Sequence, residues 1–322
     1  MSEAQAASVP PARRGPALWQ RALVWGVTIA CFVWLYTRID AAAAREGESA
    51  LSYLAAVFTR VSWSHWLALM IPYSAFFFLV DSTVVWRVVS WFDAQVPWRD
   101  ILPIRASAYI LSILNEQVGK GAMALYLNHR HGVPAWEVGS SMLFIMFCEL
   151  FYLTFWATLG YAIAGDSLPE AFRLIPWVAT GVAIFFVLWI ALMRGYLLPN
   201  LALRQRPILS TFRKAGPQHY LGVMLLRSPA LLAAVFVYTL ALRLFGVDAD
   251  FLTMLGVLPV IFFAAAVPTP MRAAAITIWV VLFPNHQAEL SAFGLVMHNF
   301  FIFFNATIGL LFLRRANREL LG

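Results

Sequence analysis

The stretch "ILSILNEQVGKGAMALYLNHRHG" (residues 110–132) begins and continues like a membrane helix but is interrupted in its middle. Three polar residues stand side by side at 115–117, and a lysine between two glycines follows at 119–121. Amide and charged groups are costly in hydrocarbon unless protein or water satisfies them. The stretch therefore predicts a broken helix whose break lies beside a polar cavity or a watery surface.

The composition around this stretch is that of an integral membrane protein. Hydrophobic residues make up 61% of the chain and charged residues 12%, whereas a soluble domain carries about 25% charged residues. The net charge of +7 does not indicate nucleic-acid binding, because the basic residues cluster at the ends of apolar segments, as the positive-inside rule expects. Cys31 and Cys148 both lie in apolar segments, so no structural disulfide is expected.

Hydropathy predicts an all-α polytopic protein with six full transmembrane spans. The predicted spans are 19–36, 65–86, 139–164, 175–193, 229–245 and 290–313. The first apolar run could be a cleaved signal peptide, because "AAAA" follows at 41–44, but Arg38, Asp40 and the length of the run favour a retained span. Residues 1–18 are predicted to be a disordered cytoplasmic tail, and residues 51–63 an amphipathic helix on the outer surface.

Two further apolar stretches, 101–127 and 251–283, are broken in the middle, the second by "PTPMR" (268–272). If both are re-entrant hairpins, most of the 23 basic residues face the cytoplasm, including the loop 194–227 and the C-terminal "RRANR" (314–318). A full crossing by one stretch would place one of these basic segments outside, and crossings by both would place the loop outside. The charge distribution therefore favours two re-entrant hairpins and cytoplasmic termini.

This topology contains a candidate inverted repeat within a single transmembrane domain, 19–318. The order span, broken hairpin, span occurs at 65–164 with the hairpin entering from the cytoplasm, and again at 229–313 with the hairpin entering from outside. Inverted repeats with broken helices near the midplane are a recurring plan of secondary transporters. The two halves share no evident residue-level similarity, so the repeat is a hypothesis about topology.

Ionisable residues inside the membrane are the first candidates for a functional site. Glu116 and Lys120 are four residues apart, which suits either a helical ion pair or a site beside the break. Glu149 lies in the middle of an apolar span, where either a function or a structural partner such as Lys120 or Arg105 would explain it. Asp81 is either functional or an interfacial group near the cytoplasmic end of its span.

The second break suits an anion. Pro268 and Pro270 cannot continue a helix, and a new half-helix from Met271 would present its partly positive N-terminus next to Arg272. The alternative is a plain turn from which Arg272 reaches water. The predicted substrate-binding residues are Asn115, Glu116, Gln117, Lys120, Glu149, Arg272 and Asp81.

Motifs for metal or nucleotide chemistry are incomplete. "GKG" at 119–121 lacks the upstream glycine and following Ser or Thr of a phosphate-binding loop. His129 and His131 are two residues apart, so they lie on different helix faces, and no cysteine or carboxylate completes a metal set. His298 is either a general base or a buried, hydrogen-bonded histidine. No cofactor or metal is expected, and the sequence favours a transporter-like protein over an enzyme.

The pattern over residues 65–318 resembles the transmembrane flippase region of bacterial lysyl-phosphatidylglycerol synthases and related stand-alone integral membrane proteins. Asn115 with the following glycines, "NHRHG" (128–132), Glu149 and the break at Pro268 carry the resemblance. The chain departs from that family in having "PTPMRAAA" where the family has a glycine-rich break and a glutamate. The resemblance implies that lipid translocation is retained and that aminoacylation is not.

The sequence thus predicts a flippase-like lipid translocase of the bacterial inner (cell) membrane, which moves a phospholipid or lipid-linked headgroup through a polar cavity at the midplane. Its expected partners are membrane lipids with anionic or zwitterionic headgroups, and not nucleic acid. Two alternatives stay open: a membrane-embedded transferase that acts on a lipid-linked substrate, and a non-transporting partner subunit of a lipid-modifying enzyme. A homo-oligomer is compatible with each.

Overall fold

The computed structural model describes residues 18–45, 47–114, 116–267, 269 and 272–321, and within them the chain is helical and contains no strand. Within the described part of the chain, six helices are long and apolar enough to cross a membrane. They are α1 (Leu18–Arg45), α3 (Trp63–Phe92), α6 (Ala135–Ala164), α7 (Ile175–Arg194), α9 (Pro217–Leu244) and α12 (Gln287–Leu321). These correspond, in order, to the six spans that hydropathy predicts, so the all-α multi-pass architecture is confirmed.

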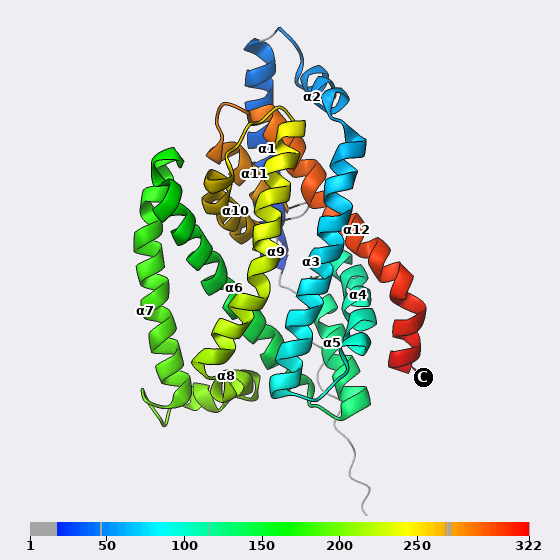
Figure 1. The fold of residues 1–322 in the computed structure, drawn as a ribbon, viewed down its shortest axis with the longest axis vertical. Helices are drawn as coiled ribbons and strands as arrows, with labels where there is room; N and C mark the ends of the chain where they lie inside the picture. Colours follow the sequence, from blue (N-terminus) through cyan, green and yellow to red (C-terminus); the bar gives the residue numbers. More distant parts are fainter. Residues whose placement is uncertain (1–17, 46, 115, 268, 270–271, 322) are drawn as a thin grey trace, which may run out of the picture.

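The other helices are shorter and lie between these six. They are α2 (Ala50–Arg60), α4 (Trp98–Leu114), α5 (Glu116–His131), α8 (Ser210–Lys214), α10 (Phe251–Ala266) and α11 (Ala273–Leu282), with the 3-10 helices η1 (Gly165–Ser167), η2 (Glu170–Leu174), η3 (Ala202–Gln205) and η4 (Pro207–Leu209). Figure 1 shows α4 and α5 in the same half of the molecule as α8, and α10 and α11 in the opposite half. We call the end that carries α8 and the arginine-rich segment 194–214 the basic end.

Helix α2 is the predicted amphipathic helix. Ser49 caps it, since its side chain accepts a hydrogen bond from the backbone N–H of Ser52 at 3.2 Å. Val57 is buried whereas Leu51 is exposed, as expected for a helix with one covered face. The helix is shorter than predicted, because the extended backbone at Val61 separates it from Trp63, which begins α3.

Helix α7 gives the plainest indication of a membrane environment. None of the residues in its most apolar window is buried inside the protein. Trp177, Val187 and Leu188 are all more than half exposed, in a helix with no charged residue before its last, Arg194. A helix that is apolar on its exposed sides requires an apolar solvent, as a membrane span does.

The opening stretch is helical at its two glycines, where the sequence predicts an interruption. Helix α4 ends at Leu114 and α5 begins at Glu116, so the two glycines at 119 and 121 lie inside a helix. Asn115 lies outside the described residues, as do the side chains of Glu116, Gln117 and Lys120. Their predicted roles in binding therefore stay predictions.

The second break lies where "PTPMR" predicts it, between α10 and α11. The side chain of Thr269 accepts a hydrogen bond from the backbone N–H of Ala274 at 3.2 Å, which satisfies one of the free donors at the start of α11. Arg272 has a left-handed backbone (φ 53°), a conformation that costs roughly 1–2 kcal/mol for a residue with a Cβ. A new helix therefore starts directly after Arg272, as the two prolines suggest.

The predicted start of the fifth span is wrong. The span does not begin at residue 229, because α9 runs from Pro217 to Leu244 with Pro229 inside it. A proline within a transmembrane helix is tolerated when neighbouring groups compensate for the lost backbone hydrogen bond. As a consequence, Arg227 lies within a helix and not in the basic loop that the predicted topology places it in.

The short helix pairs each pack on a distant span. Helix α4 lies along α12 and α10 lies along α6, while α3 contacts α9. A Cβ added to Gly160 of α6 would lie 2.4 Å from the Cα of Gly256 in α10, and one added to Gly309 of α12 would lie 2.6 Å from the carbonyl oxygen of Ala106 in α4. Small residues of this kind allow transmembrane helices to approach closely.

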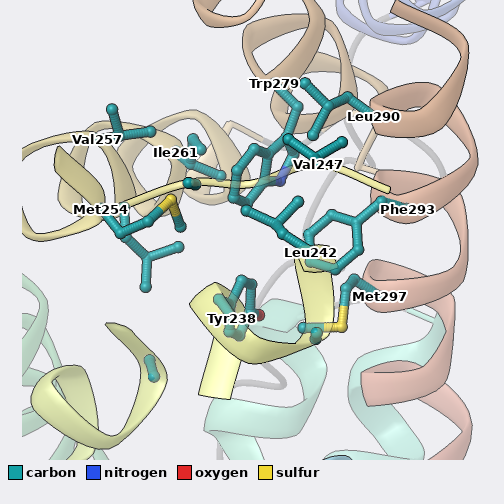
Figure 2. Packing of buried hydrophobic residues seen from close by; sticks show 14 of the residues in the cluster. Tyr238, Leu242, Val247, Met254, Val257, Ile261, Trp279, Leu290, Phe293 and Met297 are labelled. Carbon is teal, nitrogen blue, oxygen red and sulfur yellow. The ribbon is translucent and has the colours of Figure 1, made fainter. Parts of the chain in front are cut away.

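The end opposite the basic end has a dense apolar core. Figure 2 shows side chains of α9, α10, α11 and α12 converging there around Trp279. The Trp279 ring is fully buried, with its centroid 5.2 Å from that of Phe293 and 6.2 Å from that of Tyr238. This packing holds the α10–α11 pair against α9 and α12.

Candidate functional site

Four charged side chains from four helices form one network inside the protein. The Nε of Arg105 (α4) lies 2.6 Å from a carboxylate oxygen of Asp81 (α3). Arg227 (α9) joins the two halves of the network, because its Nη2 is 3.5 Å from Asp81 and its Nη1 is 3.3 Å from Glu149 (α6). Two arginines thus face two carboxylates, and the network is neutral when all four groups are ionised.

The network lies at depth along the spans. Glu149 is in the middle of the 30-residue α6, and Asp81 is in the interior of the 30-residue α3. Both positions fall within helices that are long and apolar enough to cross a membrane. Charged groups at such positions are costly and are usually paired and functional.

Asp81 is held firmly. Its side chain is 5% exposed, and besides the two arginines it accepts a hydrogen bond from the Tyr109 hydroxyl at 2.7 Å. The guanidinium of Arg105 also lies over the Tyr109 ring, 4.9 Å from its centroid. Asp81 is therefore an interior group that connects α3 to α4.

Glu149 is held loosely by comparison. Its side chain is 42% exposed, and Arg227 at 3.3 Å is its one ion-pair partner among the described side chains. Of the two partners predicted for it, Arg105 pairs with Asp81 instead, and the side chain of Lys120 is not described. Its true partner, Arg227, is missed by the sequence analysis because Pro229 falsely indicates the start of a span.

A small cavity opens beside this network, with a volume of about 30 Å³. Its polar lining consists of Asp81, Glu149, Arg227 and two tyrosines, Tyr73 and Tyr152, and Phe262 from α10 is among its apolar lining residues. The Tyr152 hydroxyl donates a hydrogen bond to the backbone carbonyl of Arg227 at 3.3 Å. A cavity of this size and polarity has room for about one or two water molecules, and it is too small for a lipid headgroup.

Arg272 belongs to a different place in the fold. It is exposed, and its charge is near enough to act on Tyr238 of α9 and His298 of α12. The Tyr238 ring contacts Tyr73, a residue of the cavity wall, at a centroid distance of 6.0 Å. Among the described side chains, no ion pair joins Arg272 to the charge network.

His298 is buried, with 2% exposure, and its Nε2 has no hydrogen-bond partner among the described residues. The sequence allows either a general base or a buried, hydrogen-bonded histidine. The burial agrees with the second alternative, but the hydrogen bond at Nε2 is missing. Within the described part of the chain, no group of three or more His, Cys, Asp or Glu side chains is arranged to hold a metal ion.

Of the predicted binding residues, the structure brings Asp81 and Glu149 together through Arg227 and leaves Arg272 at the other break. Searches of protein families, of curated proteins and of solved structures find no match to this chain.

Proposed function

We propose that the protein is a flippase-like lipid translocase that moves a phospholipid or lipid-linked headgroup past the charge network. The observation that carries this proposal is a neutral four-charge network built from four helices at the depth of the spans. Such groups are retained in membrane interiors where they serve an ion, proton or substrate path. The proposal is also what the resemblance to lysyl-phosphatidylglycerol synthases implies.

In this proposal the α4–α5 and α10–α11 pairs are re-entrant hairpins that enter from opposite faces of the membrane. The packing supports an inverted repeat in which α3, α4, α5 and α6 correspond to α9, α10, α11 and α12. Under that correspondence each of these observed helix contacts has an observed counterpart. The α3–α9 contact corresponds to itself, the α4–α12 contact corresponds to α10–α6, and the α5–α6 contact corresponds to α11–α12. The basic end would face the cytoplasm, and both termini are proposed to be cytoplasmic.

The exposure of Glu149 supports a lateral route for the lipid. A carboxylate that is 42% exposed in the middle of a span faces the layer that acyl chains occupy. Its charge is tolerable there if water or a headgroup fills the adjacent crevice. The headgroup would enter from this flank while its acyl tails stay in the bilayer.

The small cavity implies that this conformation is closed to a headgroup. Transport would therefore need the two hairpins to move relative to their neighbouring spans, as in alternating access. Arg227 and Arg272 would bind the phosphate on the two sides of the Tyr73–Tyr238 contact. Asn115, Glu116, Gln117 and Lys120, whose side chains lie outside the described residues, stay predicted substrate-binding residues.

A lipid-movement assay tests this function. The protein is reconstituted into unilamellar vesicles that contain a fluorescent phospholipid, and a membrane-impermeant reductant then reports how much of the lipid reaches the outer leaflet. We expect Arg227→Gln to lose most of the protein-dependent movement, because the network loses the charge that joins its halves. The matched control is Arg243→Gln, which alters an exposed arginine paired with Asp248 at 3.1 Å.

The comparison is restricted to variants that elute as the wild-type protein does in gel filtration. Arg227→Lys, which keeps the charge, is expected to keep part of the activity. Equal lipid movement by Arg227→Gln and the wild type would refute the assignment of the network.

A further inference from the structure

The hydrogen bonding of Arg227 is incomplete. A guanidinium carries five N–H donors in a planar fork. One of its groups, Nη1, bonds to Glu149 at 3.3 Å, and Nη2 is a long 3.5 Å from Asp81. Its Nε is buried and has no acceptor among the described residues. Arg227 thus has donor capacity to spare beside a cavity.

The two carboxylates that face Arg227 are not equivalent. Asp81 is fixed by Arg105 at 2.6 Å and by Tyr109 at 2.7 Å, both of which would have to release it before it could move. Glu149 has a single described partner and an exposed flank. If a ligand is to bind Arg227, Glu149 is the group that leaves.

We propose that Arg227 is the binding residue for an oxyanion of the phosphodiester type, and that the carboxylate of Glu149 occupies the position of that oxyanion when the ligand is absent. Planar guanidinium donors suit both carboxylate and phosphate oxygens. The hydroxyl of Tyr73, which lines the same cavity, can donate to one of the remaining oxygens. This inference deepens the proposed function. It rests on that function only in taking a lipid as the source of the oxyanion.

The exchange has a consequence for protons. A phosphodiester carries one negative charge, so replacing the Glu149 carboxylate by it keeps the network neutral. The displaced carboxylate then lacks a cation at mid-span, where an unpaired charge is costly, and it binds a proton. Oxyanion binding is therefore coupled to the uptake of one proton, and the oxyanion binds more tightly as the pH falls.

Few ionisable groups other than Glu149 contribute to this coupling. Those that face it among the described side chains are Arg227, Asp81, Arg105, Tyr152 and Tyr73. Two other helices packed on α6 add little, since α10 contains no ionisable residue and α7 contains Arg194 at its far end. The described side chains of α5, which also packs on α6, include His129, Arg130 and His131 at its far end.

Binding is measured on the full-length protein by calorimetry, in buffers of different ionisation enthalpy so that proton uptake is counted. In one arm, glycerophosphoglycerol, a soluble phosphodiester, is titrated into protein in a maltoside detergent that contains no phosphate. In the other arm, native mass spectrometry counts phosphatidylglycerol retained by protein from mixed nanodiscs. Binding in the first arm identifies a site open to soluble oxyanions, and binding in the second alone identifies a lipid headgroup as the source.

We expect Glu149→Gln to bind about tenfold more tightly than the wild type, because the variant has no competing charge. It should also take up no proton and show no pH dependence. Arg227→Gln should not bind. The matched control Glu170→Gln alters an exposed carboxylate paired with Arg173 and should bind as the wild type does.

A gain of affinity cannot arise from misfolding, so Glu149→Gln decides the question even if Arg227→Gln fails to fold. Unchanged or weaker binding by Glu149→Gln, or no binding in either arm, overturns the proposal. If oxyanions bind as expected but wild-type vesicles move no lipid, the site stands and the proposed function fails. If wild-type vesicles move lipid but Glu149→Gln gains no affinity, the proposed function stands and the oxyanion site fails.

Discussion

The α4–α5 and α10–α11 pairs occupy comparable places in the chain but are held by different forces. Helix α4 is tied to α3 by the ion pair between Arg105 and Asp81. Helices α10 and α11 contain no charged residue and are held by close glycine contacts and by the core around Trp279. Polar chemistry at depth is therefore concentrated on one side, while the other side supplies a rigid apolar wall.

The strongest test of this contrast removes the carboxylate that holds α4. Asp81→Asn leaves Arg105 and Arg227 with excess buried charge, and breaking a buried pair in this way costs about 3–5 kcal/mol. Denaturant unfolding in detergent measures the loss. Asp248→Asn, which breaks the exposed pair with Arg243, should change the free energy of unfolding by roughly 0–1 kcal/mol. Equal effects of the two variants would mean that the network does not hold α4 in place.

The packing of the apolar pair is tested at Gly160. An alanine Cβ there would lie 2.4 Å from the Cα of Gly256, so α6 and α10 would have to move apart, at a cost of about 1–3 kcal/mol. At Gly181 of α7 a Cβ meets nothing within 4 Å, and alanine should stabilise that helix by up to about 1 kcal/mol. Thermal unfolding should therefore give opposite signs for Gly160→Ala and Gly181→Ala, and the same sign would contradict this account of the contact.

A loss of stability with rising pH is expected at the basic end. Asp93 follows the last residue of α3, and burial raises the pKa of its carboxyl to about 6 despite the nearby Ser141 and Lys214. The folded state thus binds the proton more tightly than the unfolded chain, so stability falls as the pH rises from about 4 to about 6. Asp93→Asn should flatten this slope and gain about 1–2 kcal/mol at pH 7.

The matched measurement compares unfolding of the wild type and Asp93→Asn at about pH 4 and pH 7. The stabilisation should appear at the higher pH alone. A variant that is destabilised at both values would indicate that the charged carboxylate supports the fold.

The smallest expected effect concerns the start of α11. Thr269→Val removes the hydroxyl that accepts the N–H of Ala274 and should cost about 1 kcal/mol, as for other helix caps. Thr307→Val is the control, because that exposed hydroxyl donates within its own helix, to the carbonyl of Phe303. Indistinguishable thermal stabilities would show that the cap does not support the second break.

The six spans, apart from the start of the fifth, and the second break were predictable because hydropathy and prolines act locally along the chain. Glu149 was also identifiable, since a lone carboxylate in an apolar run is costly unless it is paired or functional. Arg227 was missed because Pro229 suggests the start of a helix. In sequence, a proline that is tolerated inside a helix, as in α9, looks the same as a proline at a helix start. The pairing of Asp81 with Arg105 and Arg227 depends on the packing of three helices, which one sequence without tertiary contacts does not specify.

Opposite entry of the two helix pairs is the central claim, and cysteine accessibility tests it most directly. The two native cysteines are first removed by Cys31→Ala and Cys148→Ala. Single cysteines then replace one exposed residue at a time: Gln95 or His131 on either side of the α4–α5 pair, and Asp248 or Asn285 on either side of the α10–α11 pair. A membrane-impermeant maleimide is applied to each side of sealed vesicles. We predict that Gln95→Cys and His131→Cys react from the cytoplasmic side alone, and Asp248→Cys and Asn285→Cys from the outer side alone. Labelling of the two ends of either pair from opposite sides would contradict the account.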